Sequence, residues 1–518
     1  MRAKTILIAV AVVLSFAAAP AARADIPLVD KCVPLNMLGL QPVAPAPIYK
    51  TDNVDFLGNV GAEADDLTAG GRLVGHYFYI TGSSHFSIYD VADPLHPKLM
   101  SRVNFPCRFE NEDVAVNGDI LMWTDFATTG DLYVYDVRDK SHPKEIADVA
   151  GAGTHTKECL DGCRFGFGSY HAATTSGPLR TGEVVDLLDP SKPRVLGDWT
   201  DNGVLASRNN HDSTALGPDR LLVAAAPITL LDTSASVVRP RVLAQSDTDP
   251  TKRYHTVIWP HGGQDRFMLA SFETNATPRC EAGVGDFSTF DTTSWQETHK
   301  FKLIDSYHLV NGTESDTNPP ANTLGCSPHW FNVRPSWNDG GVVALGAYDN
   351  GTKFLRVDGA GKIKEIGSFL PPGTQASGAY WITCDIVYVV DYTRGIDILR
   401  LNDPASACPA QTSGSSSTPG TSSSGQPSLA QPVARRACAS RRNFRIRLRL
   451  PRGVHRGDVR SATVRVTGRR VHVLRGRRLT APVNLRGLPP RGVTVTVRLH
   501  LKDGRTARDT RHYRTCVP

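Results

Sequence analysis

Apolar and polar residues alternate along residues 54–404 in short runs that predict β-strands, each closed by a turn. In four clear runs an aspartate ends an apolar strand and a proline-containing turn follows: "FSIYDVADPLHPKLMSRV", "LYVYDVRDKSHPKEIADV", "EVVDLLDPSKPRVLGDW" and "ITLLDTSASVVRPRVLAQ". These aspartates, Asp90, Asp136, Asp186 and Asp232, lie 46, 50 and 46 residues apart. A period of about 40–50 residues with four short strands per unit is typical of a β-propeller.

Each repeat also has a recognisable first strand. The seven are "DDLTAGGRL", "EDVAVNGDIL", "HTKECLDGCRF", "HDSTALGPDRL", "HTVIWPHGGQDRF", "HWFNVRPSWNDGG" and "AYWITCDIVYVV". Residues 54–60, "VDFLGNV", have the pattern of an outer strand, so we expect them to complete the last blade and close the ring. The sequence therefore predicts an all-β fold, with an N-terminal extension at 25–53 and a seven-bladed propeller at 54–408.

The strand-and-turn runs resemble those of a known family. "FSIYDV", "LYVYDV", "EVVDLL" and "ITLLD", each followed by a turn with proline, are similar to the LVIVD-repeat β-propellers. The resemblance covers about residues 54–404 and is closest in the first four repeats. It implies a propeller fold and export, but no activity or site residues, because that family has no single activity.

Four of the seven first strands begin at a histidine: His155, His211, His255 and His329. The first strands of a propeller start at one face of the central channel, so we expect these imidazoles to converge there. The other three first-strand starts are also polar, with Asp65 or Asp66, Glu112 and Tyr380. The second strands that end on the same rim offer Asp125, Glu273 and Asp391. Three aromatic residues flank these positions, where they either line a pocket or pack in the core: Tyr254, Trp330 and Trp381.

Imidazole nitrogens from four successive blades suit one transition-metal ion such as Zn, Fe, Cu or Mn, and disfavour Ca or Mg. The carboxylates would then accept hydrogen bonds from the outward ring N–H groups. A second interpretation is a ring of histidines that hydrogen-bond loop carbonyls and hold no metal. A third is that the histidines were inherited through repeat duplication and serve no shared site.

The first 24 residues predict a signal peptide, with a basic "MRAK", the apolar "TILIAVAVVLSFAAA" and "ARA" before Asp25. No later apolar run is long enough for a transmembrane segment. We therefore expect a secreted, extracellular or cell-surface protein whose 10 cysteines form disulfides. Cys438–Cys516 and Cys159–Cys163 are the expected pairs, whereas Cys107 and Cys384 are expected to stay reduced if they are buried apart.

The net charge of +7 conceals two oppositely charged parts. Residues 435–518 carry 24 Lys and Arg against 3 Asp and Glu, whereas residues 1–434 carry 34 against 48. Between them, residues 409–434 contain "QTSGSSSTPGTSSSGQPSLAQP", a composition that predicts a disordered linker. Runs such as "FRIRLRL" predict that residues 435–518 form a small, arginine-rich, Ig-like β-sandwich. Anionic cell-envelope polymers are its expected partners, and nucleic acid is disfavoured because an exported domain rarely meets it.

Two functions remain open at this point. The first is a surface-associated binding protein, monomeric, that takes a small ligand or metal ion at the propeller mouth. The second is a secreted metalloenzyme, redox or hydrolytic, that uses the same histidines with one open coordination position. No nucleophile elbow, phosphate-binding loop or dinucleotide fingerprint occurs in the sequence, so neither catalytic residues nor a nucleotide cofactor can be assigned.

Overall fold

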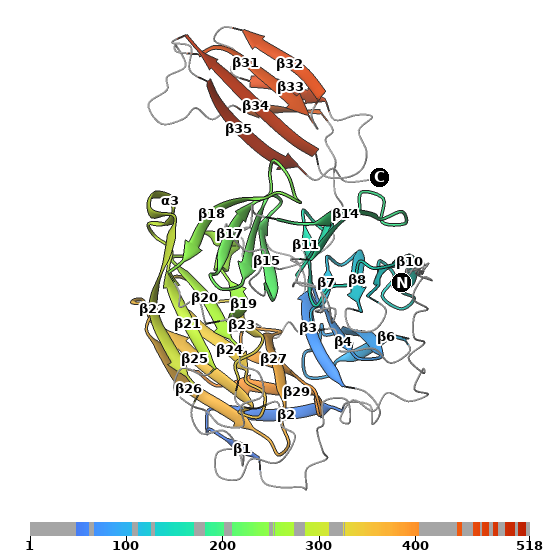
Figure 1. Cartoon of the computed structure of the whole chain (residues 1–518), viewed down its shortest axis with the longest axis vertical. Helices are drawn as coiled ribbons and strands as arrows, with labels where there is room; N and C mark the ends of the chain where they lie inside the picture. Colours follow the sequence, from blue (N-terminus) through green and yellow to red (C-terminus); the bar gives the residue numbers. More distant parts are fainter. Residues whose placement is uncertain are drawn as a thin grey trace, which may run out of the picture. The chain divides into compact units, whose positions relative to one another are not determined.

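The chain divides into two compact units, Met1–Gln431 and Pro432–Pro518. The computed structural model describes most of the first unit and six strands of the second (Figure 1). In the first unit the described residues are 48–61, 67–105, 112–125, 130–169, 182–200, 210–247, 252, 254–273, 285–309, 325 and 327–403. The predicted signal peptide, most of the N-terminal extension and the predicted linker lie outside these ranges.

The first unit is built almost entirely of antiparallel sheets in which consecutive strands pair. Its first three sheets each have four strands: β3 (Thr68–Val74), β4 (Tyr77–Gly82), β5 (His85–Asp90) and β6 (Lys98–Asn104); β7 (Ala115–Val116), β8 (Ile120–Thr124), β9 (Leu132–Asp136) and β10 (Lys144–Val149); β11 (Lys157–Leu160), β12 (Phe165–Gly168), β13 (Glu183–Asp186) and β14 (Arg194–Asp198).

The next sheet has eight strands, and two short helices accompany it. Its strands are β15 (Asp212–Gly217), β16 (Arg220–Ala224), β17 (Thr229–Asp232) and β18 (Arg241–Ser246), joined to β19 (Tyr254–Ile258), β20 (Phe267–Phe272), β21 (Asp286–Asp291) and β22 (Lys300–His308), and the helices are α2 (Pro260–Gly263) and α3 (Trp295–Thr298). A five-stranded sheet follows, with β23 (Phe331–Val333), β24 (Gly341–Gly346), β25 (Thr352–Val357), β26 (Ile363–Leu370) and β1 (Tyr49–Lys50). The last sheet of the unit consists of β27 (Ala376–Trp381), β28 (Ile386–Asp391), β29 (Gly395–Leu401) and β2 (Val54–Val60).

The sheets of the first unit surround a common centre, which makes it a β-propeller. The first strands of the repeats (β3, β7, β11, β15, β19, β23 and β27) lie innermost, and later strands such as β22 and β26 lie outside (Figure 1). Contacts join β7 to β11, β11 to β15, β15 to β19 and β23 to β27, and β27 contacts β3, so the end of the repeat region meets its beginning.

The repeated aspartates have a local structural role. Each ends the third strand of its sheet, and its Oδ1 accepts a hydrogen bond from the backbone N–H two residues later: Asp90 from Ala92 (2.9 Å), Asp136 from Arg138 (3.1 Å), Asp186 from Leu188 (3.0 Å) and Asp232 from Ser234 (2.9 Å). A short acceptor side chain that satisfies the backbone in this way favours a turn over continued strand. The period in the sequence therefore marks the strand ends.

The predicted outer strand at residues 54–60 closes the circle, as expected. It forms β2, which pairs antiparallel with β29 from Val54 opposite Leu401 to Val60 opposite Ile396. The Asn59 amide adds a hydrogen bond of 2.8 Å to Asp397 Oδ1. Residues more than 330 positions apart thus share one sheet.

We expect Val54→Ala to lower the free energy of unfolding of the first unit by about 2 kcal/mol, because Val54 is fully buried in the core that β2 helps to form. The matched control is Leu57→Ala on the same strand, where the side chain is 38% exposed, with an expected change within about 0.5 kcal/mol. Chemical denaturation measures both, and equal losses would show that β2 does not seal the ring.

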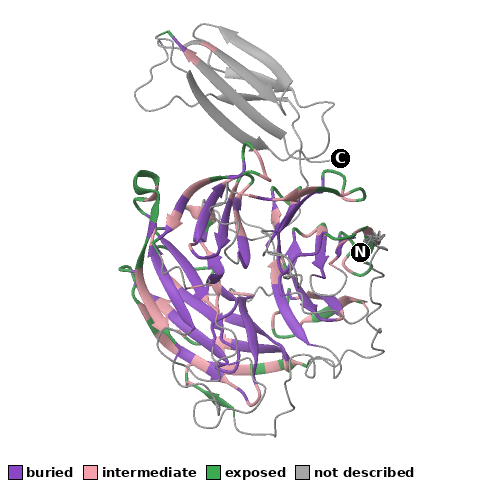
Figure 2. Ribbon diagram, viewed as in Figure 1, coloured by how far each residue is buried: buried purple, intermediate pink, exposed green. Residues whose placement is uncertain are grey.

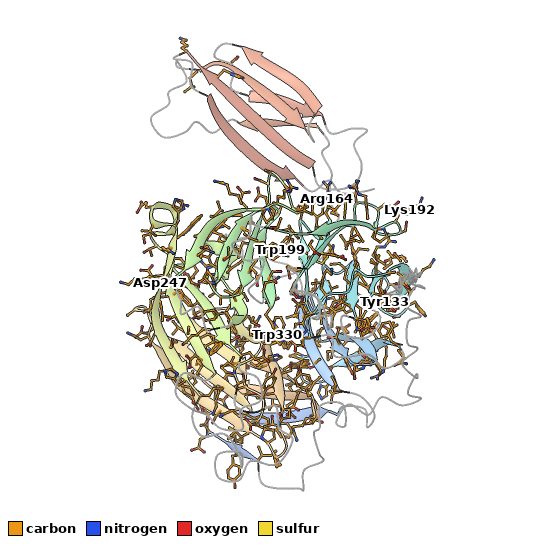
Figure 3. All side chains as sticks on the ribbon, in the orientation of Figure 1. Tyr133, Arg164, Lys192, Trp199, Asp247 and Trp330 are labelled. Carbon is orange, nitrogen blue, oxygen red and sulfur yellow. A yellow bond between two sulfur atoms is a disulfide. The ribbon has the colours of Figure 1, made fainter. Side chains whose placement is uncertain are left out.

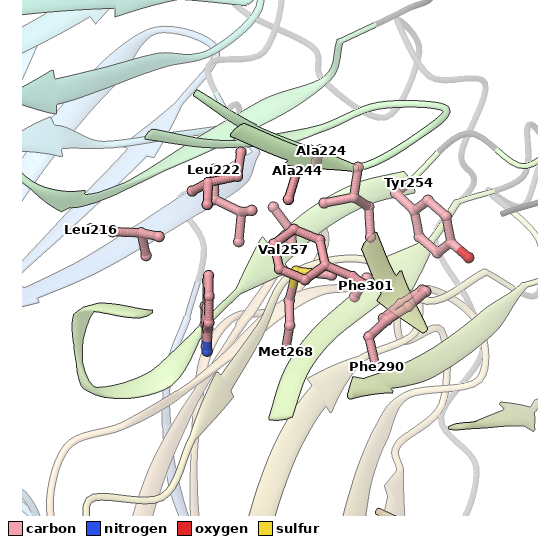
Figure 4. Close-up of a cluster of buried hydrophobic side chains, with 13 residues drawn as sticks. Leu216, Leu222, Ala224, Ala244, Tyr254, Val257, Met268, Phe290 and Phe301 are labelled. Carbon is pink, nitrogen blue, oxygen red and sulfur yellow. The ribbon is translucent and has the colours of Figure 1, made fainter. Parts of the chain in front are cut away.

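Hydrophobic clusters lie between neighbouring sheets, and Figure 2 shows the buried residues along the strands of the first unit. One cluster joins Leu222, Ala224 and Leu230 of one sheet half to Val257 and Met268 of the other (Figure 4). Equivalent clusters occur at other sheet contacts, so apolar packing holds the blades together. The polar residues at the starts of the first strands are therefore free to face the central channel.

The second unit contains two antiparallel sheets. Their strands are β30 (Asn443–Arg447) paired with β33 (Thr480–Asn484), and β31 (Val459–Val466), β32 (Arg469–Arg475), β34 (Val493–Leu501) and β35 (Thr506–Tyr513) in the order β32-β31-β34-β35. All-β structure was predicted for this region, and the described strands confirm that much.

The cysteines give a mixed outcome. Cys159 and Cys163 form a disulfide, as predicted. The expectation that Cys384 stays reduced is wrong, because this cysteine is disulfide-bonded. The sequence of a single strand does not show which cysteine the fold brings next to it. Cys438 and Cys516 lie outside the described residues.

Within the described residues, no helix is both long and apolar enough to cross a membrane.

Candidate metal centre

The four predicted histidines meet at one place. His155, His211 and His329 stand just before β11, β15 and β23, and His255 is the second residue of β19. Successive ring centroids are 4.4 Å apart for His155–His211, 3.8 Å for His211–His255 and 4.0 Å for His255–His329. All four are buried. The predicted convergence of the histidines is confirmed.

Glu112 lies at the centre of this group. Its Oε2 is 3.2 Å from His255 Nε2, 3.4 Å from His329 Nε2, 3.5 Å from His155 Nε2 and 3.9 Å from His211 Nε2. The Nε2 atoms of His155 and His211 are themselves 2.8 Å apart. Four imidazoles therefore present the same ring atom to one buried carboxylate oxygen. The sequence predicted Glu112 as a residue of the channel rim, and its central position is a finding of the structure.

The outer ring nitrogens indicate how the imidazoles are oriented. His329 Nδ1 lies 2.8 Å from the Ser377 carbonyl oxygen, which can only accept, so Nδ1 carries the proton. In neutral His329 the Nε2 lone pair then faces the Glu112 carboxylate. Two facing acceptors repel one another unless a proton or a metal ion lies between them. A backbone acceptor behind the ring is also the usual support of a metal-binding histidine.

The charges in this cluster are strongly coupled. Burial alone would raise the pKa of Glu112, yet the charges of His155 and His329, with hydrogen bonds from His155 and His255, hold it well below its ordinary value. Burial and the nearby His329 lower the pKa of His255 to about 4. For His329, burial acts downward, but contact with Glu112 outweighs it and raises the pKa. At neutral pH the cluster therefore contains an ionised carboxylate and a neutral His255.

Glu273 supplies a second carboxylate. Its Oε2 is 3.9 Å from His211 Nε2, and its Oε1 accepts a 2.7 Å hydrogen bond from the Tyr348 hydroxyl. The Tyr348 ring lies 4.5 Å from that of His329. Among the described residues, two groups have ligand atoms mutually within 4.8 Å, Glu112–His211–His255 and His255–Glu273–His329. Tyr348 was not predicted, since its stretch "GAYDN" reads as an ordinary turn.

Close packing against β3 holds the Glu112 segment in place. A Cβ atom added at Gly70 would lie 2.1 Å from the Glu112 carbonyl oxygen, so only glycine allows this approach. Next to Glu112, Asp113 Oδ1 accepts a 3.0 Å hydrogen bond from Arg72 Nη2, and the same nitrogen donates to Glu158 Oε2 at 3.1 Å. Arg72 thus ties three first-strand segments together around the channel.

We expect Gly70→Ala to displace Glu112 and to weaken metal binding by about 10–100-fold, the range typical of residues that support metal ligands. Gly58→Ala is the control, because a Cβ there meets no atom within 4 Å. Competitive titration of Zn²⁺ against a chromophoric chelator measures both variants. Wild-type affinity in Gly70→Ala would show that this contact does not position Glu112.

The other predicted site residues lie in different places. Tyr254 packs in a hydrophobic cluster with its ring 5.8 Å from that of Phe290. Trp330, labelled in Figure 3, has its ring 5.1 Å from that of His255 and packs beside the histidine cluster. Asp125 and Asp391 are buried but belong to neither metal-capable group of the described residues.

Asp391 instead supports the turn after β28 and the segment before β27. Its Oδ1 accepts hydrogen bonds from the backbone N–H groups of Thr393 (2.9 Å) and Arg394 (3.1 Å), and its Oδ2 accepts from the Thr374 hydroxyl and the Gln375 backbone N–H. Asp65, predicted on the same rim, lies outside the described residues.

The chain is similar to known proteins in structure, at 7–10% sequence identity in the examples below. No protein-family model matches it, and no curated protein matches it. Among solved structures, it is similar to U3-55K (7% identity, 67% of this chain and 98% of that one, TM-score 0.42). It is also similar to the N-terminal domain of Nup159 (10%, 69% and 97%, 0.39) and to YCF48 bound to D1 peptide (10%, 70% and 98%, 0.40). The last two proteins are β-propellers.

Proposed function

We propose that this β-propeller is a metal-binding protein whose four histidines and Glu112 hold one transition-metal ion. The supporting observation is the spacing of the ligand atoms. Two ligands that each lie 2.0–2.2 Å from one ion are roughly 3.0–3.6 Å apart in octahedral or tetrahedral geometry. Three of the four separations between Nε2 and Glu112 Oε2, at 3.2, 3.4 and 3.5 Å, fall in this range. Imidazole ligands favour Zn, Fe, Cu or Mn.

We also infer that the propeller has seven blades. The eight-stranded sheet consists of two antiparallel units of four strands, and the strand pairing described between them is the parallel pairing of Gln245 with Lys300 and Ser246 with Phe301. Counting these units separately gives seven, in agreement with the seven first strands of the sequence. The strand-and-turn pattern supports an LVIVD-like propeller.

We propose that the protein acts outside the cell, which the leader-like residues 1–24 support. It is proposed to act as a monomer that also takes a small ligand at the propeller mouth. Residues 1–434 carry a negative net charge and residues 435–518 a positive one, so the two parts are expected to bind different partners. The basic unit is proposed to anchor the protein to anionic envelope polymers. Such anchoring is expected to weaken steeply with salt.

Thermal denaturation of the chelator-treated, full-length protein tests metal binding. A ligand that binds only the folded state raises the melting temperature as its concentration exceeds its dissociation constant. We expect one of Zn²⁺, Mn²⁺, Cu²⁺ and Fe²⁺ to raise it at micromolar concentration, and Ca²⁺ and Mg²⁺ to have no effect. If none of the transition metals shifts the transition, the metal-binding proposal is wrong.

A secreted metalloenzyme is the second candidate, favoured by the environment of Glu273. Its side chain is 12% exposed, against 4% for Glu112 and 0% for His255, so solvent reaches the cluster on its side. An ion with an open position there would supply Lewis-acid or redox chemistry. Glu273, oriented by Tyr348, would then hold or receive a proton. Loss of turnover in Tyr348→Phe with metal content retained would favour this candidate over simple binding.

A further inference from the structure

The backbone register of the second unit sorts the residues of its four-stranded sheet into two faces. Directly opposite residues of an antiparallel pair share a face, and neighbouring residues along a strand alternate between faces. One face carries Val493, Val495, Val497 and Leu499 of β34, with Val466, Val464 and Ala462 of β31 opposite the last three. Arg511 and Asp509 of β35 and Arg469 and His472 of β32 also fall on this mainly apolar face. The other face carries the intervening positions, which are mainly Arg, Thr and His.

Two pairs of arginines stand directly opposite each other on this polar face. Arg498 of β34 is opposite Arg508 of β35, and Arg465 of β31 is opposite Arg470 of β32. Because Thr463 is opposite Arg498, and Arg465 follows two residues later, both pairs lie on the same face. Four strands therefore contribute to one basic surface, which no single stretch of the sequence indicates.

Such pairing is unfavourable by itself. Like charges directly opposite on a sheet destabilise it, and a neighbouring carboxylate would ordinarily relieve the repulsion. Among the described residues of the sheet, the one acidic position is Asp509, opposite Val497 and hence on the apolar face. A sheet that places arginines together without an acid beside them is suited to an anion supplied from outside.

We infer that the polar face of the β32-β31-β34-β35 sheet, marked by Arg465, Arg470, Arg498 and Arg508, binds a linear polymer that carries repeated phosphate or carboxylate groups. Adjacent strands are about 4.8 Å apart and alternate residues about 6.7 Å apart, so the arginine positions form a grid on the scale of successive anionic repeats. Guanidinium groups bind both phosphate and carboxylate in a bidentate manner. This inference rests on the proposed anchoring role and gives it a surface.

The test compares two double variants of the full-length protein that each remove two positive charges. Arg498→Gln/Arg508→Gln alters the polar face. Arg445→Gln/Arg447→Gln alters β30, a strand of the other sheet in which arginines alternate with apolar residues. The probes are immobilised long-chain polyphosphate and polygalacturonate, at low and high salt. We expect wild type to bind at least one and elute with salt, the polar-face variant to bind at least about 10-fold more weakly, and the β30 variant to stay within about 3-fold.

The outcomes distinguish failure of the anchoring role from failure of the assigned arginine surface. If wild type binds neither polymer, the anchoring proposal itself fails, and binding to anionic lipid vesicles alone would assign the charge to membranes instead. If wild type binds but the polar-face variant binds equally well, or both variants lose binding equally, the assigned surface is wrong while anchoring stands. Arg465→Gln/Arg470→Gln provides a second variant of the same face should the first fail to fold. The polymer that retains wild type identifies which anion the surface takes.

Discussion

Replacing His255 by alanine is expected to lower the affinity of the protein for the proposed transition-metal ion by more than about 100-fold, beyond the 10–100-fold range of supporting residues. His255 is fully buried and is the residue that the two metal-capable groups of the described residues share. Its Nδ1 lies 2.7 Å from the Thr256 hydroxyl, which holds the ring with Nε2 toward Glu112. Competitive chelator titration measures the loss.

His96→Ala is the matched control for this substitution. The side chain of His96 is 81% exposed and contacts Asp93 in a surface turn, whereas the histidines of the cluster are buried. It should leave metal affinity unchanged. Equal affinity in His255→Ala and His96→Ala would remove His255 from the metal centre.

Replacing Glu112 by glutamine is expected to have a comparably large effect. Glutamine keeps the size of the side chain but removes the negative charge that four Nε2 atoms face within 3.9 Å. A buried cation without its carboxylate is left with an uncompensated charge, which in protein interiors is strongly unfavourable. Metal affinity should fall by more than about 100-fold, whereas the fold should survive because Glu112 takes no part in the apolar packing between sheets.

Glu158→Gln distinguishes loss of a ligand from loss of any buried charge. Glu158 is as buried as Glu112, but it pairs with Arg72 at 3.1 Å and belongs to neither metal-capable group. We expect this variant to lose stability and to keep its metal. If Glu158→Gln and Glu112→Gln lose metal equally, the effect is general to the channel and Glu112 is no ligand.

Much of the fold was predictable because its signals are local. The aspartates that end the third strands accept hydrogen bonds within two residues, so their period survives in the sequence wherever the turn is kept. The closing strand β2 could be predicted as well, since its alternation matches that of other outer strands. The junction of the eight-stranded sheet was not predictable, because two parallel residue pairs leave no pattern.

The site was predictable only in part. The first strands of a propeller start at one face of the central channel, so histidines at four successive strand starts had to lie close together once these starts were assigned correctly. The packing of Tyr254 in a hydrophobic cluster could not be predicted, because a β-bulge between Tyr254 and Thr256 interrupts the alternation of side chains along β19. The central position of Glu112 could not be predicted, since it depends on Gly70 and Arg72 of another sheet. The opposed arginines of the second unit likewise depend on cross-strand register.

The most direct test of the metal centre is elemental analysis of the full-length protein, purified without an affinity tag and without added metal. We predict close to one equivalent of Zn, Fe, Cu or Mn per chain, and its loss in His211→Ala/His255→Ala. A wild-type protein that contains no transition metal, and whose thermal stability no added transition metal changes, would contradict the central claim.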